Sequence, residues 1–446
     1  MEPTPPGPGV VGTSSLVPTP PGTSGGVGHT ADTAAPEDPE ATLMRGFLAA
    51  FPLVFTERVL AGKPVDAFVW HQSRPTPTLD HAPNPDVIYA IGLVDLRAEP
   101  AVLHTTDLFD RYWSMQVSDL FVESVAYVGT RETGGAGGDH VIVPPGYQGY
   151  LPPGVPVIEA TSTRMVVLGR IHVRDDDDVP NVLALQPGYS LSTLSAWRGQ
   201  TGPTMPEAPP VRGPQHETAT NGVAFWDELG DILLATTPRV EEQPLFDALL
   251  PYGIGPGLHP SEQITDPDLL DRLERITVDG LADIVAETDS YRHWIPELHA
   301  GRFDGDLLHR AAWCSDGWVT QEPVEAVYVR SELYDGASPH VLRMEASQLP
   351  PAEAFWSISV YGEDSHPIAN PQERYSVQST DPTLIFGPKG GVEIRFAPTW
   401  PGGPPDNWLP VDATRRYNVF LRAYIPGDSV LDGTWQPPPI ELLPPP

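Results

Sequence analysis

The chain has 446 residues, with 59 acidic and 26 basic side chains and a formal net charge of -33. Binding to a nucleic acid backbone or to an anionic membrane surface needs clustered Lys and Arg, so this charge argues against both kinds of partner. The 55 prolines and 41 glycines argue against long helices and favour turns between short strands. Cys314 is the single cysteine, which excludes an intramolecular disulfide, and its apolar neighbours predict a buried, inert thiol.

The N-terminal residues lack the basic and apolar segments of a signal peptide, and no apolar run reaches the roughly 18 residues that a spanning helix needs. We therefore expect a soluble protein, with the cytoplasm as its default compartment. Residues 1–40 are mostly Pro, Gly, Ser and Thr. They have too few large apolar side chains to offset the entropy of ordering, which predicts a disordered tail.

The first structured segment begins with a predicted short amphipathic helix over residues 41–51, which Pro52 should end or kink. From residue 65 to about 194, short apolar runs alternate with turn residues, as is typical of a β-sandwich or barrel. The run from Tyr112 to Ser118 alternates cleanly, with Trp113, Met115 and Val117 on one face. We therefore predict a β-rich N-terminal domain over residues 41–197.

A different pattern separates this domain from the next one. Residues 198–221 are rich in Pro, Gly and Thr, which indicates a linker. Apolar residues then recur at helical spacing over residues 223–235 and 261–287, and Asp266, followed by a proline, is a suitable helix cap. We assign residues 198–320 to a linker and helical segment.

Alternation returns in the last part of the chain and predicts a β-sandwich-like domain with a Pro-rich tail over residues 321–446. Trp356–Val360 resembles Trp113–Val117, and each run follows a Pro-x-Val-Leu step. The match is short enough to arise by chance, but it also fits two domains that present an equivalent central strand. The predicted fold is mainly β, with two β-sandwich-like domains joined by a helical connecting segment.

The common catalytic signatures are absent from the sequence. There is no Gly-x-Ser-x-Gly elbow, no His-Glu-x-x-His pair and no phosphate-binding loop, and the 13 histidines show no metal-ligand spacing. The four aspartates at residues 175–178 predict a solvated turn, because adjacent carboxylates on a strand point to opposite sides. We therefore predict no metal site, and the sequence identifies no cofactor.

Charged side chains inside apolar strands are the first site candidates. Asp119 directly follows the Trp113 strand, and Arg170 and Arg422 each lie within an apolar run. A charge in such a place must be paired or must face a cleft. One interpretation is an internal ion pair or a solvent-facing position. The other is a pocket for a polar or anionic small molecule, in which an Arg binds a carboxylate or phosphate.

Several short stretches resemble a known pair of domains. Stretches of the first half resemble the bacterial family called domain of unknown function 1254: Asn84–Tyr89, Arg111–Asp119, Gly129–Gly134 and Leu168–Arg170. Stretches of the second half resemble its usual companion, domain of unknown function 1214: 355–357, 370–371, 374–376, 407–410 and 431–438. The resemblance covers about residues 45–443. It implies two β-sandwich-like domains with helices between them and no established activity.

The same resemblance supplies further site candidates, which suit either a small-molecule pocket or turn capping and interdomain hydrogen bonding. In the first domain they are Asn84, Asp86, Tyr89 and Arg131, and in the second they are Arg374, Tyr375, Asn407 and Trp408.

Two functional hypotheses follow, and a purely structural role of these residues is the third possibility. The first is an enzyme acting on a small polar or carbonyl-bearing molecule at the interdomain cleft. Asp86 or Asp119 would act as general base there, and Arg131 or Arg374 would hold an anion. The alternative is a non-catalytic binding module for carbohydrate or a protein partner, with exposed aromatic side chains such as Trp408 and Trp435. The sequence does not indicate an oligomeric state.

Overall fold

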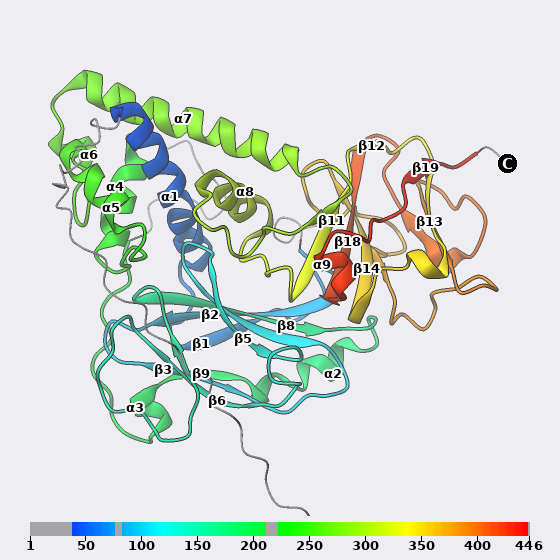
Figure 1. Ribbon diagram of the computed structural model, residues 1–446, viewed down its shortest axis with the longest axis horizontal. Coiled ribbons are helices and arrows are strands. Elements are labelled where there is room, and N and C mark those ends of the chain that lie inside the picture. The colour runs from blue at the N-terminus through cyan, green and yellow to red at the C-terminus, as the bar shows by residue number, and fades with distance from the viewer. Residues whose placement is uncertain (1–37, 76–82, 211–221, 445–446) are drawn as a thin grey trace, which may run out of the picture. The chain divides into compact units, whose positions relative to one another are not determined.

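The computed structural model describes residues 38–75, 83–210 and 222–444, which fold into four β-sheets and a layer of helices (Figure 1). The described residues from Pro39 onward form one compact unit. The predicted disordered tail lies outside the described residues as far as residue 37, and so does the second half of the predicted linker.

Two sheets pack face to face to form the first β-sandwich. The larger sheet has the strand order β1 (Ala67–Trp70), β2 (Val87–Asp95), β8 (Arg164–His172), β4 (Trp113–Asp119) and β5 (Ser124–Gly129). The smaller sheet has the order β7 (Val157–Glu159), β6 (Gly138–Val143), β3 (Ala101–Thr105) and β9 (Ser190–Thr193). The alternation predicted from Trp113 to Ser118 is confirmed, because Trp113, Met115 and Val117 lie together in the core between these sheets.

The second β-sandwich also consists of a larger and a smaller sheet. The larger sheet has the order β10 (Pro296–Glu297), β11 (Ala326–Arg330), β18 (Arg416–Pro426), β14 (Ala352–Gly362) and β15 (Ser376–Gln378), with β12 (Tyr334–Asp335) paired to β18. The smaller sheet has the order β17 (Trp408–Pro410), β16 (Val392–Ala397), β13 (His340–Met344) and β19 (Ile440–Leu442). Val419 and Leu421 of β18 lie in its core with Ile358 of β14.

The two sandwiches repeat each other strand by strand. The order β1-β2-β8-β4-β5 corresponds to β10-β11-β18-β14-β15, and β7-β6-β3-β9 corresponds to β17-β16-β13-β19. The pairings of the small sheets also agree in direction, since β6–β7 and β16–β17 are both parallel and the other pairs are antiparallel. The two strands with similar sequences, β4 and β14, are interior strands at equivalent places. Both sandwiches therefore have one topology, and the short sequence match falls within it.

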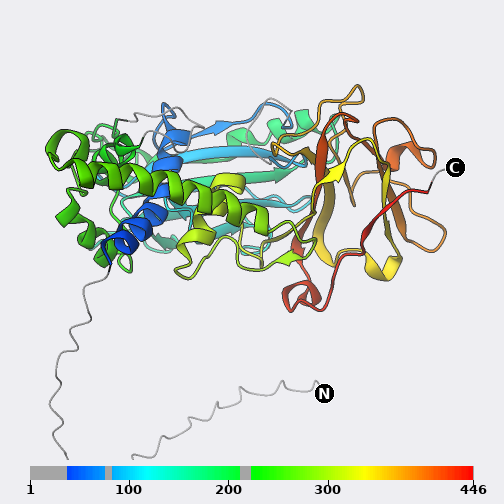
Figure 2. The same ribbon diagram turned by 90° about the horizontal axis from the view of Figure 1, so that it is seen from above.

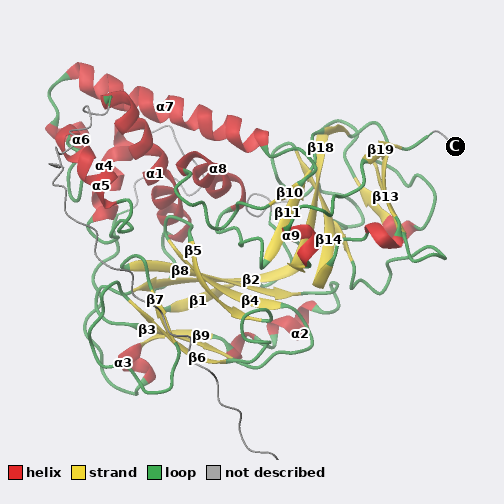
Figure 3. Cartoon of the chain, viewed as in Figure 1, coloured by secondary structure: helices red, strands yellow, loops and turns green. Residues whose placement is uncertain are grey.

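Helices cover the face of the first large sheet that lies opposite its small sheet, as Figures 1 to 3 show. Phe47 and Trp226 of these helices share a core with Ile91 and Leu168 of the sheet. Asp266 caps the longest helix by accepting a hydrogen bond from the backbone N–H of Asp268, as predicted. The helices are α1 (Pro39–Leu60), α4 (Val223–Leu233), α5 (Gln243–Leu249), α6 (Pro260–Gln263), α7 (Pro267–Ser290) and α8 (Leu307–Gly317), while α2 (Val179–Leu183), α3 (Leu194–Trp197) and α9 (Asp428–Leu431) lie in loops.

The prediction for α1 was wrong in two respects. The helix continues through Pro52 to Leu60, and it is buried on all sides instead of being amphipathic. Pro52 removes one backbone hydrogen bond, but the turns before and after it are both buried against other helices and the sheet. Among the described helices, none is both long and apolar enough to cross a bilayer.

Candidate functional site

The outer faces of the two large sheets meet beside the end of α8. Along β8, Leu168 and Arg170 alternate with residues of the sandwich core and so point away from it, and Phe420 and Arg422 do the same on β18. A cavity of about 100 Å³ lies where these faces meet. We call it the junction cavity. Its lining includes Asn84, Tyr89, Arg170, Trp313, Asp316, Tyr328, Arg422 and Tyr424.

Arg170 brings a buried positive charge to the junction cavity. The residue is only 4% exposed. One guanidinium nitrogen donates to Oε1 of Gln116 at 2.7 Å, and another donates to the carbonyl of Val319 at 2.7 Å. Both acceptors are neutral, and no carboxylate in the described part of the chain forms an ion pair with Arg170. A buried guanidinium of this kind favours an anionic partner.

Arg422 occupies the equivalent position in the second sandwich. It is 2% exposed, and it donates to Oγ of Ser359 at 3.2 Å. Its guanidinium carbon lies 4.9 Å from the ring centre of Phe420 and 5.5 Å from that of Tyr361. The aromatic rings face the cation in a cation–π arrangement, which helps to keep its charge in an apolar setting.

Asn84 fixes the direction of two hydrogen bonds at the cavity wall. The backbone N–H of Asp86 donates to Oδ1 of Asn84 at 2.9 Å, so the amide NH₂ must be the group that faces Oη of Tyr424 at 2.5 Å. The backbone N–H of Asn84 donates to Oη of Tyr89 at 3.0 Å. Both phenol oxygens therefore act as acceptors, and each hydroxyl proton can be donated to a further acceptor.

Tyr328 and Tyr424 at the cavity are protonated at neutral pH. Burial raises the pKa of Tyr424 well above its ordinary value. Burial also raises the pKa of Tyr328, and the positive charges of Arg170 and Arg422 offset only part of that rise. Both groups are thus hydroxyl donors and not phenolates.

Trp313 adds one more donor. It is buried, and its indole N–H has no hydrogen-bond partner among the described residues. The carboxylate at the wall is already engaged, because Asp316 forms an ion pair with Arg330 and accepts from Oγ of Ser365 at 3.0 Å. The polar lining is therefore dominated by donors, which suits a ligand that offers acceptor oxygens.

Comparison with known proteins identifies both halves of the chain. The family described as "Protein of unknown function (DUF1254)" matches residues 65–193, and "Protein of unknown function (DUF1214)" matches residues 327–428. The chain belongs to the two-domain DUF1254–DUF1214 family. The DUF1254 match spans β1 to β9, and the DUF1214 match spans most of β11 and ends within α9. The first match thus covers the first sandwich, and the second match covers the second sandwich except β10, β19 and the first residue of β11.

One solved structure shows the same fold. The VPA0106 protein from Vibrio parahaemolyticus is 20% identical with a TM-score of 0.68, and the match covers 91% of this chain and 100% of that one. A putative uncharacterized protein from Burkholderia cenocepacia is 14% identical with a TM-score of 0.45, and the match covers 92% of this chain and 90% of that one. The likeness to the VPA0106 protein shows the fold alone. No curated protein matches the chain.

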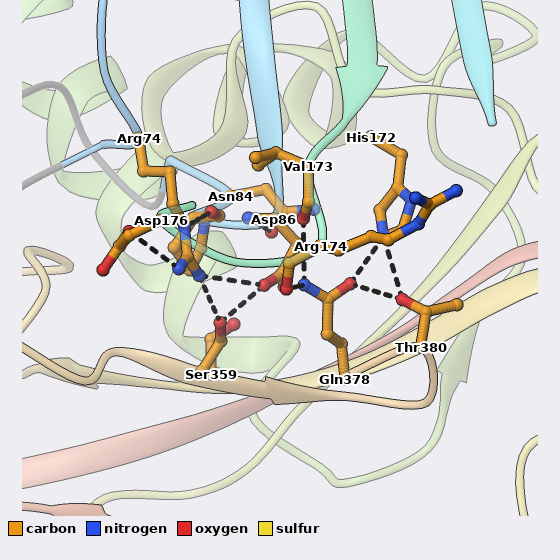
Figure 4. Close-up of polar contacts among 12 residues, drawn as sticks. Arg74, Asn84, Asp86, His172, Val173, Arg174, Asp176, Ser359, Gln378 and Thr380 are labelled. Carbon is orange, nitrogen blue, oxygen red and sulfur yellow. Dashed lines mark hydrogen bonds and ion pairs between the residues drawn. The ribbon is translucent and has the colours of Figure 1, made fainter. Parts of the chain in front are cut away.

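Asp86 of the DUF1254 domain lies next to the junction cavity but not in its wall. Its buried carboxylate accepts from Oγ of Ser376 at 2.5 Å and lies 3.5 Å from a guanidinium nitrogen of Arg74. Arg74 also binds Asp176 at 3.1 Å (Figure 4). Since Ser376 belongs to the DUF1214 domain, Asp86 links the two domains.

Asp119, the other predicted base, lies at the opposite end of β8. It pairs with Met165 in the sheet, whereas Val87 pairs with His172, a separation of roughly 20 Å along the strand. Its buried carboxylate accepts from the backbone N–H of Phe121 and binds Arg239 at 2.7 Å. Asp86 and Asp119 therefore do not share a site.

Three further candidates, Arg131, Arg374 and Tyr375, lie away from the junction cavity. Arg131 forms an ion pair of 2.6 Å with Glu325. Arg374 donates to the carbonyl of Pro405 and lines, with Tyr375, a separate hollow of about 200 Å³. None of these side chains is part of the wall of the junction cavity.

Asn407 and Trp408 hold the backbone of the second sandwich together. The amide of Asn407 donates to the carbonyls of Ile385 and Glu393, and the indole N–H of Trp408 donates to the carbonyl of Ala397 at 2.9 Å. Of the candidates, the junction cavity thus brings together Asn84, Tyr89, Arg170 and Arg422. Within the described residues, no group of His, Cys, Asp and Glu is arranged to hold a metal ion.

The sequence analysis missed several residues of the cavity wall. Tyr328 corresponds to Tyr89, because each pairs with the Arg of its own sandwich. Extending the internal similarity from β4 and β14 to the neighbouring strands would have found it. Trp313 and Asp316 lie at the end of α8, where no local pattern marks them. Their role depends on a contact between distant parts of the chain.

Proposed function

We propose that the junction cavity binds a small organic anion through its carboxylate group. The observation that supports this proposal is the presence of two buried guanidinium groups, Arg170 and Arg422, in the wall of one cavity. A carboxylate can accept two parallel hydrogen bonds from one guanidinium, and such charge-assisted bonds are about twice as strong as neutral ones. A bound carboxylate would also neutralise a charge that Arg170 now shares only with neutral acceptors.

The size and lining of the cavity limit the ligand to a few carbon atoms. Its volume is about 100 Å³, whereas one water needs roughly 10–15 Å³ and a cavity of about 150 Å³ holds benzene. The rings of Tyr89, Tyr328 and Phe420 would pack against the carbon chain. The hydroxyl of Tyr89 would donate to an oxygen of the ligand.

We do not extend the proposal to acid–base catalysis by Asp86 or Asp119, because neither lines the junction cavity. A bound molecule with a carbonyl group could still be polarised by the hydroxyl protons of Tyr89 and Tyr424. The alternative of an aromatic binding surface finds less support. Trp435 is 7% exposed, and the indole N–H of Trp408 already donates within the sandwich.

Isothermal titration calorimetry of the full chain with propionate and propionamide tests the proposal. The two molecules have the same shape and differ mainly in charge. We expect propionate to bind and propionamide not to bind. Replacing both arginines, Arg170→Gln together with Arg422→Gln, should weaken propionate binding about tenfold or more, because neither sandwich then offers a guanidinium to the carboxylate.

Arg343→Gln is the matched control, since Arg343 is half exposed and binds Glu393 in the small sheet of the second sandwich. It should bind propionate like the unmodified chain. Equal and measurable binding of propionate and propionamide would overturn the proposal, and so would the absence of binding by both propionate and malonate.

A further inference from the structure

The duplication of the two sandwiches extends to the residues of the junction cavity. In the first sandwich, Tyr89 of β2 pairs with Arg170 of β8, which pairs with Ser114 of β4. In the second sandwich, Tyr328 of β11 pairs with Arg422 of β18, which pairs with Ser357 of β14. The same three residue types thus stand in the same register on equivalent strands.

Both Tyr–Arg pairs face the same space. All four side chains line the junction cavity. Electrostatics agrees with this placement, since the charges of Arg170 and Arg422 both lower the pKa of Tyr328 against the larger effect of burial. The cavity therefore has one equivalent anion-binding group on each side, contributed by the two halves of one chain.

The charged side chains in the cavity wall are two arginines, Arg170 and Arg422, and one aspartate, Asp316. Asp316 is the carboxylate that lines the cavity within the described residues, and it is held by Arg330, which approaches it from β11. Arg170 and Arg422 both present guanidinium groups to the same cavity. A ligand with two negative charges matches this wall better than a ligand with one.

We infer that the ligand is a short dicarboxylate that places one carboxylate at Arg170 and the other at Arg422. This inference rests on the proposed function, and it adds the class of the ligand. A chain of two to four carbons fits the volume of the cavity, which is about 100 Å³. A monocarboxylate of the same length would bind one Tyr–Arg pair through its carboxylate. Its apolar end would then lie against the other guanidinium. There it would displace water without replacing the hydrogen bonds that the water makes.

Calorimetric titration with malonate and propionate tests the inference, because both have three carbons and differ by one carboxylate. The full chain is used. The ionic strength is held constant, so that charges are screened equally in the malonate and propionate titrations. We expect malonate to bind about tenfold or more tightly than propionate, as an additional charge-assisted pair would give. Arg170→Gln and Arg422→Gln should each reduce the affinity for malonate to about that of propionate.

The outcomes separate the inference from the proposed function. If propionate binds as tightly as malonate, or if only one of the two arginines matters, the dicarboxylate is excluded while the binding of an organic anion stands. If neither compound binds the unmodified chain, the proposed function fails and the inference fails with it. The comparison on the unmodified chain decides the matter even if a Gln variant does not fold. Arg170→Lys and Arg422→Lys keep the positive charge but lose the planar guanidinium that donates two parallel hydrogen bonds. Their affinity for malonate should lie between that of the unmodified chain and that of the Gln variants.

Discussion

His172 on β8 and Gln378 on β15 join the two sandwiches through a contact of 2.6 Å between Nε2 and Oε1 (Figure 4). Nε2 of Gln378 donates to the carbonyls of Val173 and Arg174, so its Oε1 is the atom that faces the histidine. An amide oxygen can only accept, and His172 must therefore carry its proton on Nε2. The orientation of one glutamine thus determines the tautomer of a histidine 206 residues away in the sequence.

Protonation of His172 should destabilise the fold. Burial lowers the pKa of His172 below its ordinary value of 6.5, against the opposing effects of the hydrogen bond to Gln378 and the charge of Asp86, while Arg111 and Arg174 lower it further. The unfolded chain then binds more protons than the folded chain between the two pKa values. The contribution of His172 to the free energy of unfolding is present above pH 6.5. It is lost as the pH falls through the folded-state pKa.

Urea unfolding at pH 7.5 and at pH 5 measures this effect, and His172→Gln is the reference because its amide can still donate to Gln378. Other buried groups such as Glu57 and Glu325 have raised pKa values, because burial outweighs their pairing with Arg, and they act in the opposite direction. The difference between the two proteins therefore isolates His172. An identical pH dependence of both would contradict the prediction.

Asp119→Ala should reduce the free energy of unfolding by about 3 kcal/mol or more, because removing one partner leaves Arg239 and two backbone N–H groups without their acceptor. Guanidinium chloride unfolding gives the value. Asp177→Ala is the control at an exposed position on the acidic turn, and it should change stability by less than about 0.5 kcal/mol. A small effect of Asp119→Ala would mean that its carboxylate is not a structural ion-pair partner.

Local patterns were sufficient to predict the sheets but only part of the site. Period-two alternation depends on neighbouring residues, and the Trp113 strand was therefore predicted correctly. Arg170 and Arg422 could be selected because a charge inside an apolar strand needs a special environment. Which environment it meets is a tertiary property. Asp119 appeared equally suitable, yet its carboxylate is paired with Arg239, which lies 120 residues away in the sequence.

The failed prediction for α1 has the same origin. Burial on all sides comes from helices far along the chain, such as α7 and α8, and the residues of α1 alone do not reveal it. The duplication is a similar case. In the sequence, the duplication is visible only as a few similar residues in β4 and β14. In the structure, the matching strand order and register show the duplication directly. The matched Tyr–Arg pairs could be recognised only once that register was known.

Gly280→Ala should destabilise the chain although alanine is the better helix former. Gly280 lies on the buried side of α7, and a Cβ at this position would overlap the ring of Phe47 on α1. The gain in helix propensity is about 1 kcal/mol, and overpacking costs about 1–3 kcal/mol. Asp279→Ala, at the preceding and exposed position of the same helix, is the matched control and should be neutral or slightly stabilising. If thermal unfolding shows Gly280→Ala to be the more stable of the two, α1 and α7 are not in close contact at this point.

Cys314 should not react with thiol reagents while the chain is folded. Its side chain is fully buried in α8, and burial raises the pKa of the thiol far above its ordinary value, so almost no reactive thiolate forms at neutral pH. Reaction with a chromogenic disulfide reagent should be slow in buffer and complete within seconds to minutes in guanidinium chloride. Ser73→Cys in a Cys314→Ser background supplies an exposed thiol for comparison, since Ser73 lies on the surface. If Cys314 reacted as fast as that thiol in the folded chain, the packing of α8 against α1 would have to open far more often than a buried helix contact allows.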